Sequence, residues 1–340
     1  MSISVLCFSK DRPLQLEAYL RSLFRFSRET LPVTVLYACE KRFDPAYAKL
    51  RSFFPSVDFV RETDFRDQVL GCLRQIDTPL FMFGCDDVIF KRAWQPKEIW
   101  RVFQVLPELL AFSLRLGTEI TYCQPLGANM SEPDFLEVTP FLLWRWPLGD
   151  ADWGYPWELD CTIYTTQFVR RMLLALERFG WAHPNLLEGH GANLIGSTIG
   201  LDLLAQDPYI RESVLARIAK TILVAMGRRP LNRLEDISLF SELNRFLRGM
   251  VVRQIGGRDL MASYAQARAS VITINRVQDV SRNPVYEGDL TAEVLLDKWN
   301  GGTVLDTDAY AERSYSSIHV GEAYFCKRSE QTLRMYGSAQ

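Results

Sequence analysis

Glycine-rich phosphate loops are missing from this 340-residue sequence, which contains neither GxGxxG nor GxxxxGKS/T. The ordinary dinucleotide-binding and P-loop classes are therefore excluded. No CxxC pair occurs among the seven dispersed cysteines, which favours reduced core thiols and a cytoplasmic protein. No run reaches the ~18 apolar residues of a membrane span. Strand-like residues follow Met1 directly, so we expect no signal peptide.

An excess of charge of one sign is also missing. Lys and Arg number 39 against 41 Asp and Glu, which gives a net charge of -2 and no reason to expect a nucleic-acid partner. Hydrophobic residues make up 48% of the chain, enough to bury a full core at this length.

Two adjacent carboxylates, Asp86 and Asp87, closely follow an apolar run at residues 80–83. The run is short and dense, which predicts a buried strand. Side chains just past the carboxyl end of such a strand face the crevice where open α/β sheets bind ligands. A pair of carboxylates there suits Mg²⁺ or Mn²⁺ carrying a diphosphate. An Asp-Asp turn without any metal is the alternative.

Strand-like and helix-like segments alternate along the amino-terminal part of the chain. Such alternation predicts an α/β fold with a Rossmann-like, mainly parallel sheet flanked by helices. The expected strands are 3–8, 33–37, 57–60 and 80–83, and the expected helices are 14–26, 47–54 and 67–76. The turn that follows the first strand and the Asp-Asp turn would then lie at the same edge of the sheet.

This arrangement resembles the GT-A nucleotide-sugar glycosyltransferases, and is most similar to bacterial, family-2-like members. The resemblance rests on the turn Ser9-Lys10-Asp11-Arg12-Pro13, on Glu40 after the second strand, and on Cys85-Asp86-Asp87 at the position of an Asp-x-Asp metal motif. The usual first Asp of that motif is a cysteine here. The resemblance implies donor binding by Ser9, Lys10, Asp11, Arg12, Glu40, Asp86 and Arg115. It also implies Mn²⁺ or Mg²⁺ on Asp87 and His319, and leaves open which of the two adjacent carboxylates is the direct ligand.

Two further features have both a functional and a structural interpretation. Arg115, in the strand-like run 111–117, is either a clamp for a phosphate or carboxylate or part of a structural ion pair. Aromatic residues gather with carboxylates between residues 144 and 160, and such a mixture suits either an acceptor-sugar platform or an aromatic minicore under a loop. The residues expected to bind the acceptor are Trp144, Trp146, Trp153 and Tyr155.

A general base is also implied by the resemblance, because an acidic residue in a loop after the acceptor-side strand and helix serves this role in inverting enzymes. Glu188, in the segment 181–191 that we expect to be a loop, occupies the matching place. Asp160, at the start of the strand-like run 159–164, is the alternative catalytic carboxylate. A salt-bridged or helix-capping glutamate remains the structural interpretation of Glu188.

Residues 210–258 differ from the rest of the chain. Segment 211–258 carries ten Arg and Lys against four Asp and Glu, and its apolar residues recur with helical spacing. It is either an element at the inner face of an anionic membrane or a packed helical subdomain or homodimer face. We therefore divide the chain into a nucleotide-sugar and acceptor-binding core at 1–204, a helical insertion at 205–265 and the rest of the catalytic domain at 266–340.

The resemblance thus implies a metal-dependent, inverting transferase that moves a sugar from a nucleoside diphosphate-sugar to a carbohydrate or other hydroxyl acceptor. A nucleotidyltransferase shares such a sheet and metal carboxylates, but the turn Ser9–Pro13 lacks the glycines typical of that class. The missing first Asp of the metal motif also fits a non-catalytic carbohydrate-binding or scaffold protein.

Overall fold

The computed structural model of the chain describes residues 3–195, 258–277 and 290–329. A nine-stranded sheet forms its centre. In spatial order its strands are β3 (Asp58–Arg61), β2 (Val33–Ala38), β1 (Ile3–Lys10), β4 (Leu80–Cys85), β11 (Thr162–Thr165), β6 (Leu109–Ser113), β12 (Leu260–Tyr264), β10 (Phe141–Arg145) and β9 (Leu136–Val138). The pairings make every strand parallel in direction to β1 except β11 and β10. The expected α/β fold with a mainly parallel sheet is confirmed.

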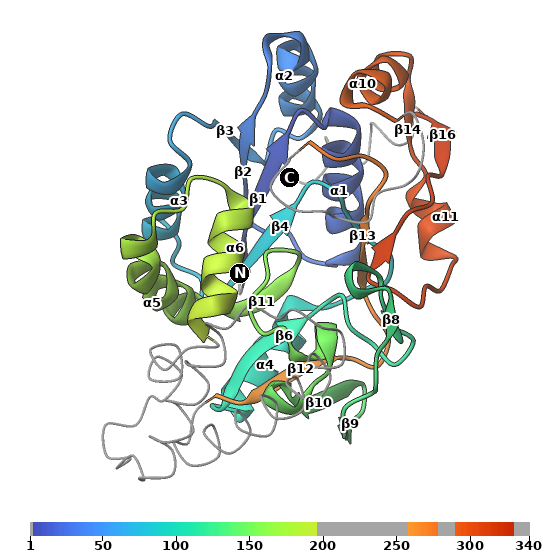
Figure 1. The fold of residues 1–340 in the computed structure, drawn as a ribbon. Coiled ribbons are helices and arrows are strands. Elements are labelled where there is room, and N and C mark those ends of the chain that lie inside the picture. The colour runs from blue at the N-terminus through green and yellow to red at the C-terminus, as the bar shows by residue number, and fades with distance from the viewer. Residues whose placement is uncertain (1–2, 196–257, 278–289, 330–340) are drawn as a thin grey trace, which may run out of the picture.

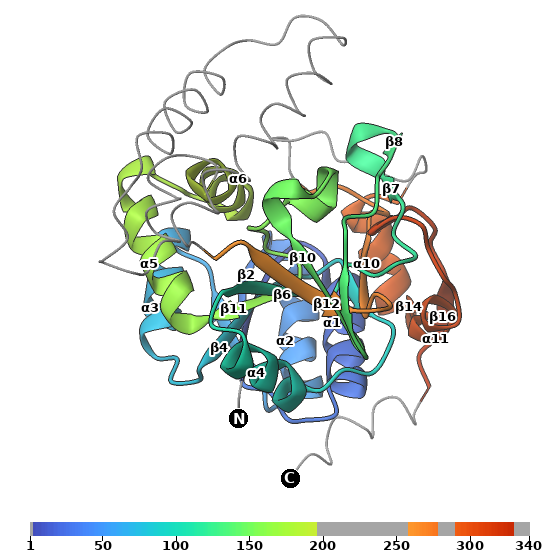
Figure 2. The ribbon, with the colours of Figure 1, turned by 90° about the horizontal axis from the view of Figure 1, so that it is seen from below.

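Helices cover both faces of this sheet (Figures 1 and 2). On one face lie α3 (Phe65–Arg74), α5 (Thr166–Leu176) and α6 (Pro184–Ile195). On the other face α1 (Pro13–Phe26) lies next to the sheet, and α10 (Ala292–Asn300) and α11 (Thr307–Ala311) lie farther out. The remaining α-helices of the described chain are α2 (Asp44–Phe53) and α4 (Pro96–Val105).

Helix α1 follows β1 directly because Pro13 occupies its first turn, where a missing N–H costs nothing. Its residues from Pro13 to Leu23 are all buried, since α10 and the short strand β14 (Thr303–Leu305) cover its outer side. Buried Glu17 of α1 accepts hydrogen bonds from Arg328 at 2.6 Å and from the indole of Trp299 at 2.6 Å. These contacts fix the C-terminal part of the described chain against the first helix.

A second, three-stranded sheet stands beside the main one. It joins β15 (His319–Val320), β13 (Ala269–Ile272) and β5 (Val88–Phe90), which directly follows the Asp-Asp turn. Two-stranded sheets are formed by β14 with β16 (Phe325–Lys327) and by β7 (Tyr122–Cys123) with β8 (Ala128–Asn129). Through β5 and β15, the Asp-Asp turn and His319 belong to one structural unit.

Helix α6 and strand β12 lie where the sequence predicts a loop and a helical insertion. Residues 181–191, expected as a loop, mostly belong to helix α6, so Glu188 is a helical residue. The expected insertion 205–265 includes β12, a strand of the central sheet, so a helical insertion would have to end before Leu260. Nearly all of the basic block, residues 210–257, lies outside the described residues. Within the described residues, we find no helix with the length and apolarity needed to cross a membrane.

Candidate active site

Strands β1, β2 and β4 end together at one edge of the sheet. Lys10 is in register with Ala38, and Phe8 with Cys85. The backbone N–H of Asp86 donates to the carbonyl of Phe8 at 3.0 Å. Asp11 has a φ of 53°, which an aspartate tolerates better than most residues, and its carboxylate accepts from the N–H of Glu40 at 2.8 Å. The turns after the three strands therefore form one connected unit, as the sequence predicts.

Asp86 points into the protein and organises this unit. Its Oδ2 accepts from the hydroxyl of Ser9 at 2.8 Å and from the N–H of Lys10 at 3.1 Å, and its Oδ1 accepts from Arg12 at 3.1 Å. Only 4% of its side chain is exposed. Burial raises its pKa, and these bonds oppose the shift. Of the two adjacent aspartates, Asp86 therefore has the structural role.

Arg12 is held from three directions. Its Nη1 donates to Asp87 at 2.8 Å as well as to Asp86, and its Nη2 donates to the carbonyl of Asn275 at 2.7 Å. Its own N–H donates to the hydroxyl of Tyr47 at 3.3 Å. Through Nη1 and Nη2, the guanidinium links the first turn, the Asp-Asp turn and the segment after β13.

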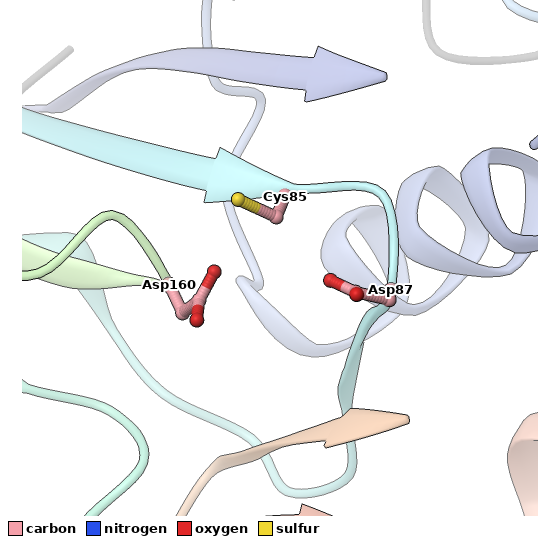
Figure 3. A group of neighbouring side chains, drawn as sticks. All are labelled: Cys85, Asp87 and Asp160. Carbon is pink, nitrogen blue, oxygen red and sulfur yellow. The ribbon is translucent and has the colours of Figure 1, made fainter. Parts of the chain in front are cut away.

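Cys85, Asp87 and Asp160 face a common space, as Figure 3 shows. One ligand atom of each, the sulfur or a carboxylate oxygen, lies within 4.8 Å of the other two. Asp160 reaches this place because β11 runs antiparallel to β4, so the residues before β11 lie beside the end of β4. The N–H of Cys161, which has a φ of 68°, donates to the carbonyl of Phe83 at 3.0 Å and fixes this placement.

This group fits a divalent cation by its charge and geometry. Two carboxylates from separate elements converge, and carboxylate oxygens suit hard cations. The pKa of Asp87 is raised to about 7, mainly by burial and also by the charges of Asp86 and Asp160, while Arg12 opposes the shift. Burial also raises the pKa of the Cys85 thiol, with further contributions from Asp160 and Asp87. His319 is not in the group; burial, followed by Arg115, lowers the pKa of its imidazole.

Arg115 is the buried cation behind Asp160. Its guanidinium lies 2.9 Å from Glu158 and 3.7 Å from Asp160. Glu158 in turn accepts from the backbone N–H of Asp160 at 2.7 Å. Burial raises the pKa of Glu158 to about 7, although Arg115 opposes the shift. Of the two interpretations of Arg115, a ligand clamp or a structural ion pair, the structure shows the ion pair. Glu158 was not singled out from the sequence, and its place among the carboxylates at 150–160 was the only signal.

Glu188 belongs to the same acidic region through α6. It accepts a hydrogen bond from the hydroxyl of Tyr155. The pKa of Glu188 is raised to about 8, mainly by burial and also by the charges of Asp160 and Glu158, while Arg115 and the hydrogen bond from Tyr155 oppose the shift. Helix α6 is fixed by the indole of Trp157, which donates to the carbonyl of Leu187 at 3.4 Å.

The expected acceptor platform is wrong for Trp144, Trp146 and Trp153, which are buried. The rings of Trp144 and Trp153 meet edge to face at 5.0 Å, and the Trp144 indole donates to the carbonyl of Trp153 at 2.9 Å. These rings form the aromatic minicore, because they are buried and pack against each other and so are not available to a sugar. Tyr155, through its bond to Glu188, is the member of the expected platform that lies at the acidic site.

A pocket of about 410 Å³ opens beside the first turn. Its lining includes Lys10, Asp11, Glu40, Arg42 and Glu293. Arg42 bridges Glu40 at 2.7 Å and Glu293 at 2.9 Å, and so joins the turn after β2 to the first turn of α10. The expected donor residues thus fall into two sets: Lys10, Asp11 and Glu40 line the pocket, whereas Ser9, Arg12, Asp86 and Arg115 are buried in internal contacts.

Comparison with known proteins shows that this chain is similar to a glycosyltransferase. No family model matches the chain. The bifunctional glycosyltransferase pgtA of Dictyostelium discoideum is 26% identical over 350 residues, which cover 95% of this chain and 39% of that protein. The chain therefore spans well under half of this relative. The predicted resemblance to a glycosyltransferase is confirmed by this match.

Two solved structures are similar over much of the chain. Mannosyltransferase PcManGT from Pyrobaculum calidifontis, in complex with GDP-Man and Mn²⁺, is 11% identical with a TM-score of 0.36 over 75% of this chain and 72% of that one. S. aureus TarS 1–349, in complex with UDP-GlcNAc, is 11% identical with a TM-score of 0.37 over 75% of this chain and 72% of that one.

Proposed function

We propose that the chain transfers a sugar from a nucleoside diphosphate-sugar to a hydroxyl of a carbohydrate or another acceptor, with a divalent cation and with inversion at the sugar. The observation that carries this proposal is the match to a glycosyltransferase along 95% of the chain. The acidic site supports it, because that site lies at the carboxyl edge where α/β sheets bind ligands.

The donor nucleotide would occupy the 410 Å³ pocket. Lys10 lines this pocket, and its N–H also contacts Asp86, so the pocket and the Asp-Asp turn are adjacent. A nucleoside there would place its diphosphate toward Asp87. Glu40 and Asp11 offer carboxylate oxygens to the hydroxyls and N–H groups of a nucleoside.

Asp87 and Asp160 would hold the cation, with 17% and 18% of their side chains exposed. A bound divalent cation would neutralise charge that develops on the leaving diphosphate. Arg115 and Arg12 would keep these two carboxylates oriented, since each guanidinium contacts one of them.

Glu188 would take the proton from the acceptor hydroxyl. Glu188 is half-buried, its carboxyl is oriented by Tyr155, and its pKa is raised to about 8, which suits proton transfer near neutral pH. Asp160, which was the alternative base, is assigned to the cation because it converges with Asp87.

The test is incubation of the protein with a panel of nucleotide sugars, with and without Mn²⁺, followed by NMR of any product. Cation-dependent donor hydrolysis or transfer with inverted configuration is the expected result. Formation of a nucleotide-sugar from a nucleoside triphosphate would instead identify a nucleotidyltransferase. Sugar binding without any turnover would identify a non-catalytic carbohydrate-binding protein, and a retained configuration would remove the need for Glu188 as base.

A further inference from the structure

Cys85 is the unusual member of the acidic site. It is the last residue of β4, and its sulfur converges with oxygens of Asp87 and Asp160 to within 4.8 Å. A tetrahedral cation with bonds of roughly 2.0–2.3 Å holds its ligand atoms about 3.3–3.8 Å apart. The three side chains would therefore close by up to about 1 Å to bind one ion. Figure 3 shows the sulfur on the side of Cys85 that is nearer to Asp160.

We infer that Cys85 is a direct ligand and determines which cation the site prefers, favouring Zn²⁺, Co²⁺ and Cd²⁺ over Mg²⁺. The inference rests on the proposed function for the presence of a cation, but it does not depend on sugar transfer. Sulfur is a soft ligand that selects zinc-like ions, whereas Mg²⁺ keeps to oxygen ligands and bound water.

The charges around the site permit a third anionic ligand. Arg12 lies 2.8 Å from Asp87, and Arg115 lies 3.7 Å from Asp160, so each carboxylate already shares a buried cation. When the ion binds, the bond from sulfur to hydrogen breaks, the bond from sulfur to metal forms, and the proton leaves to solvent. Because Arg12 also pairs with Asp86 and Arg115 with Glu158, the dication and the two guanidinium groups carry four positive charges against five negative charges on the thiolate and the four carboxylates.

Cobalt provides the readout, because a thiolate bound to Co²⁺ gives a charge-transfer band in the near ultraviolet. The parent protein, Cys85→Ser, Cys85→Asp and the control Cys72→Ser would be titrated with Co²⁺. Cys72 is a half-buried thiol on α3 outside the group, so its variant controls for thiol content. We expect the band in the parent and in Cys72→Ser, its displacement by Zn²⁺ or Cd²⁺ but not by Mg²⁺, and its loss in Cys85→Ser.

Affinities make the test quantitative. Cys85→Ser should weaken Cd²⁺ binding by about tenfold or more while leaving Mn²⁺ binding within about threefold. Cys85→Asp, which places a carboxylate at the first position of the motif, should shift the preference from Cd²⁺ toward Mn²⁺ and Mg²⁺. If circular dichroism shows that either variant is unfolded, alkylation of the parent protein tests whether Cys85 is a ligand. Bound Zn²⁺ should then protect Cys85 from alkylation and leave Cys72 reactive.

Some outcomes would overturn the inference. A cobalt band that survives in Cys85→Ser, or a parent without any band that still binds Mn²⁺ and donor, would exclude the thiol as ligand and leave the proposed function standing. A band that depends on Cys85 in a protein without transfer or hydrolysis would support the ligand and contradict the proposed function. Alkylation of Cys85 at the same rate with and without Zn²⁺ would also exclude it.

Discussion

Arg12 Nη1 lies 2.8 Å from Asp87 Oδ2, and the same nitrogen lies 3.1 Å from Asp86 Oδ1. One guanidinium therefore restrains both carboxylates of the Asp-Asp turn. They differ in what else they contact, because Asp86 also accepts from Ser9 and from the N–H of Lys10, whereas Asp87 faces Asp160 and Cys85. Mutations of the two aspartates should therefore have different consequences.

Asp87→Asn should weaken cation-dependent binding of UDP or GDP at least about tenfold, or roughly 1.4 kcal/mol, while the protein stays folded. The amide keeps the shape of the side chain but loses the charge that attracts the cation. Calorimetry with Mn²⁺ present and absent measures the effect. Asp77→Asn, at an exposed position just before the amino end of β4, is the matched control. Equal affinities in the parent and Asp87→Asn would remove Asp87 from the site.

Glu188→Gln should lower turnover by roughly 10²-fold or more, with donor and cation affinities nearly unchanged, because the amide cannot accept a proton. The pKa of about 8 means that the base form of Glu188 increases as the pH rises to that value. The parent rate should therefore rise with pH up to about 8, and this rise should be lost in Glu188→Gln. Exposed Glu177 supplies the control variant Glu177→Gln.

A second variant separates the roles of the two candidate carboxylates. Asp160→Asn should weaken cation-dependent donor binding, since Asp160 converges with Asp87. Normal turnover in Glu188→Gln, together with a turnover loss confined to Asp160→Asn at saturating donor and metal, would transfer the role of base to Asp160.

Helix α6 should tolerate alanine at one glycine and not at the other. A Cβ added at Gly191 would lie 2.1 Å from Nε1 of Trp157, a fully buried ring that cannot move away, whereas Gly189 has open space within 4 Å. Gly191→Ala should destabilise the protein by about 1–3 kcal/mol through overpacking. Turnover should also fall, because Glu188 lies one turn earlier on the same helix.

The control Gly189→Ala should raise stability by about 0.5–1 kcal/mol, since alanine loses less backbone entropy than glycine in a helix. Denaturant unfolding and steady-state rates measure both quantities. Equal stability of the two variants would contradict the close packing of α6 on Trp157.

The elements predicted from the sequence are those whose signals are local. The strands at 3–10, 33–38 and 80–85 are dense apolar runs, and Pro13 marks the start of α1. These local signals are enough to predict that the turn of Ser9–Arg12 and the Asp-Asp turn lie at one edge of the sheet. Helix α6 was missed because glycine, histidine and proline between 181 and 191 have the composition of a loop. Gly191 is present because Trp157 packs against that helix, and such a contact leaves no local pattern.

The parts of the site that the sequence did not predict depend on contacts between distant segments. Asp160 reaches Asp87 only because β11 is antiparallel to β4, and strand direction is not encoded in the strand itself. The partner of Arg115 is Glu158, 43 positions later in the sequence, and the pairing follows from the fold. Tryptophans mixed with carboxylates suit both a sugar platform and a minicore, and burial alone distinguishes the two.

Lys91, which follows β5, should destabilise the protein at neutral pH. Its side chain is buried, its ammonium lies 5.0 Å from the centre of the Tyr315 ring, and its Nζ makes no hydrogen bond within the described residues. Burial lowers its pKa from 10.5 to about 8, and Arg92 contributes in the same direction. The unfolded chain therefore binds more protons than the folded protein between these two values, so stability should rise as the pH increases from about 8 to 10.5.

Lys91→Met should remove this penalty, which is at most about 3 kcal/mol for the shift to about 8, and should lose a cation–π contact of about 1 kcal/mol. We therefore expect the variant to be more stable than the parent by about 1–2 kcal/mol at pH 7, and the difference to shrink by pH 10 as the parent lysine loses its proton. Urea unfolding at both pH values measures this, and exposed Lys97→Met is the control, expected to stay within about 0.5 kcal/mol of the parent. A destabilised Lys91→Met at pH 7 would mean that the buried ammonium has a stabilising partner, and would overturn the argument.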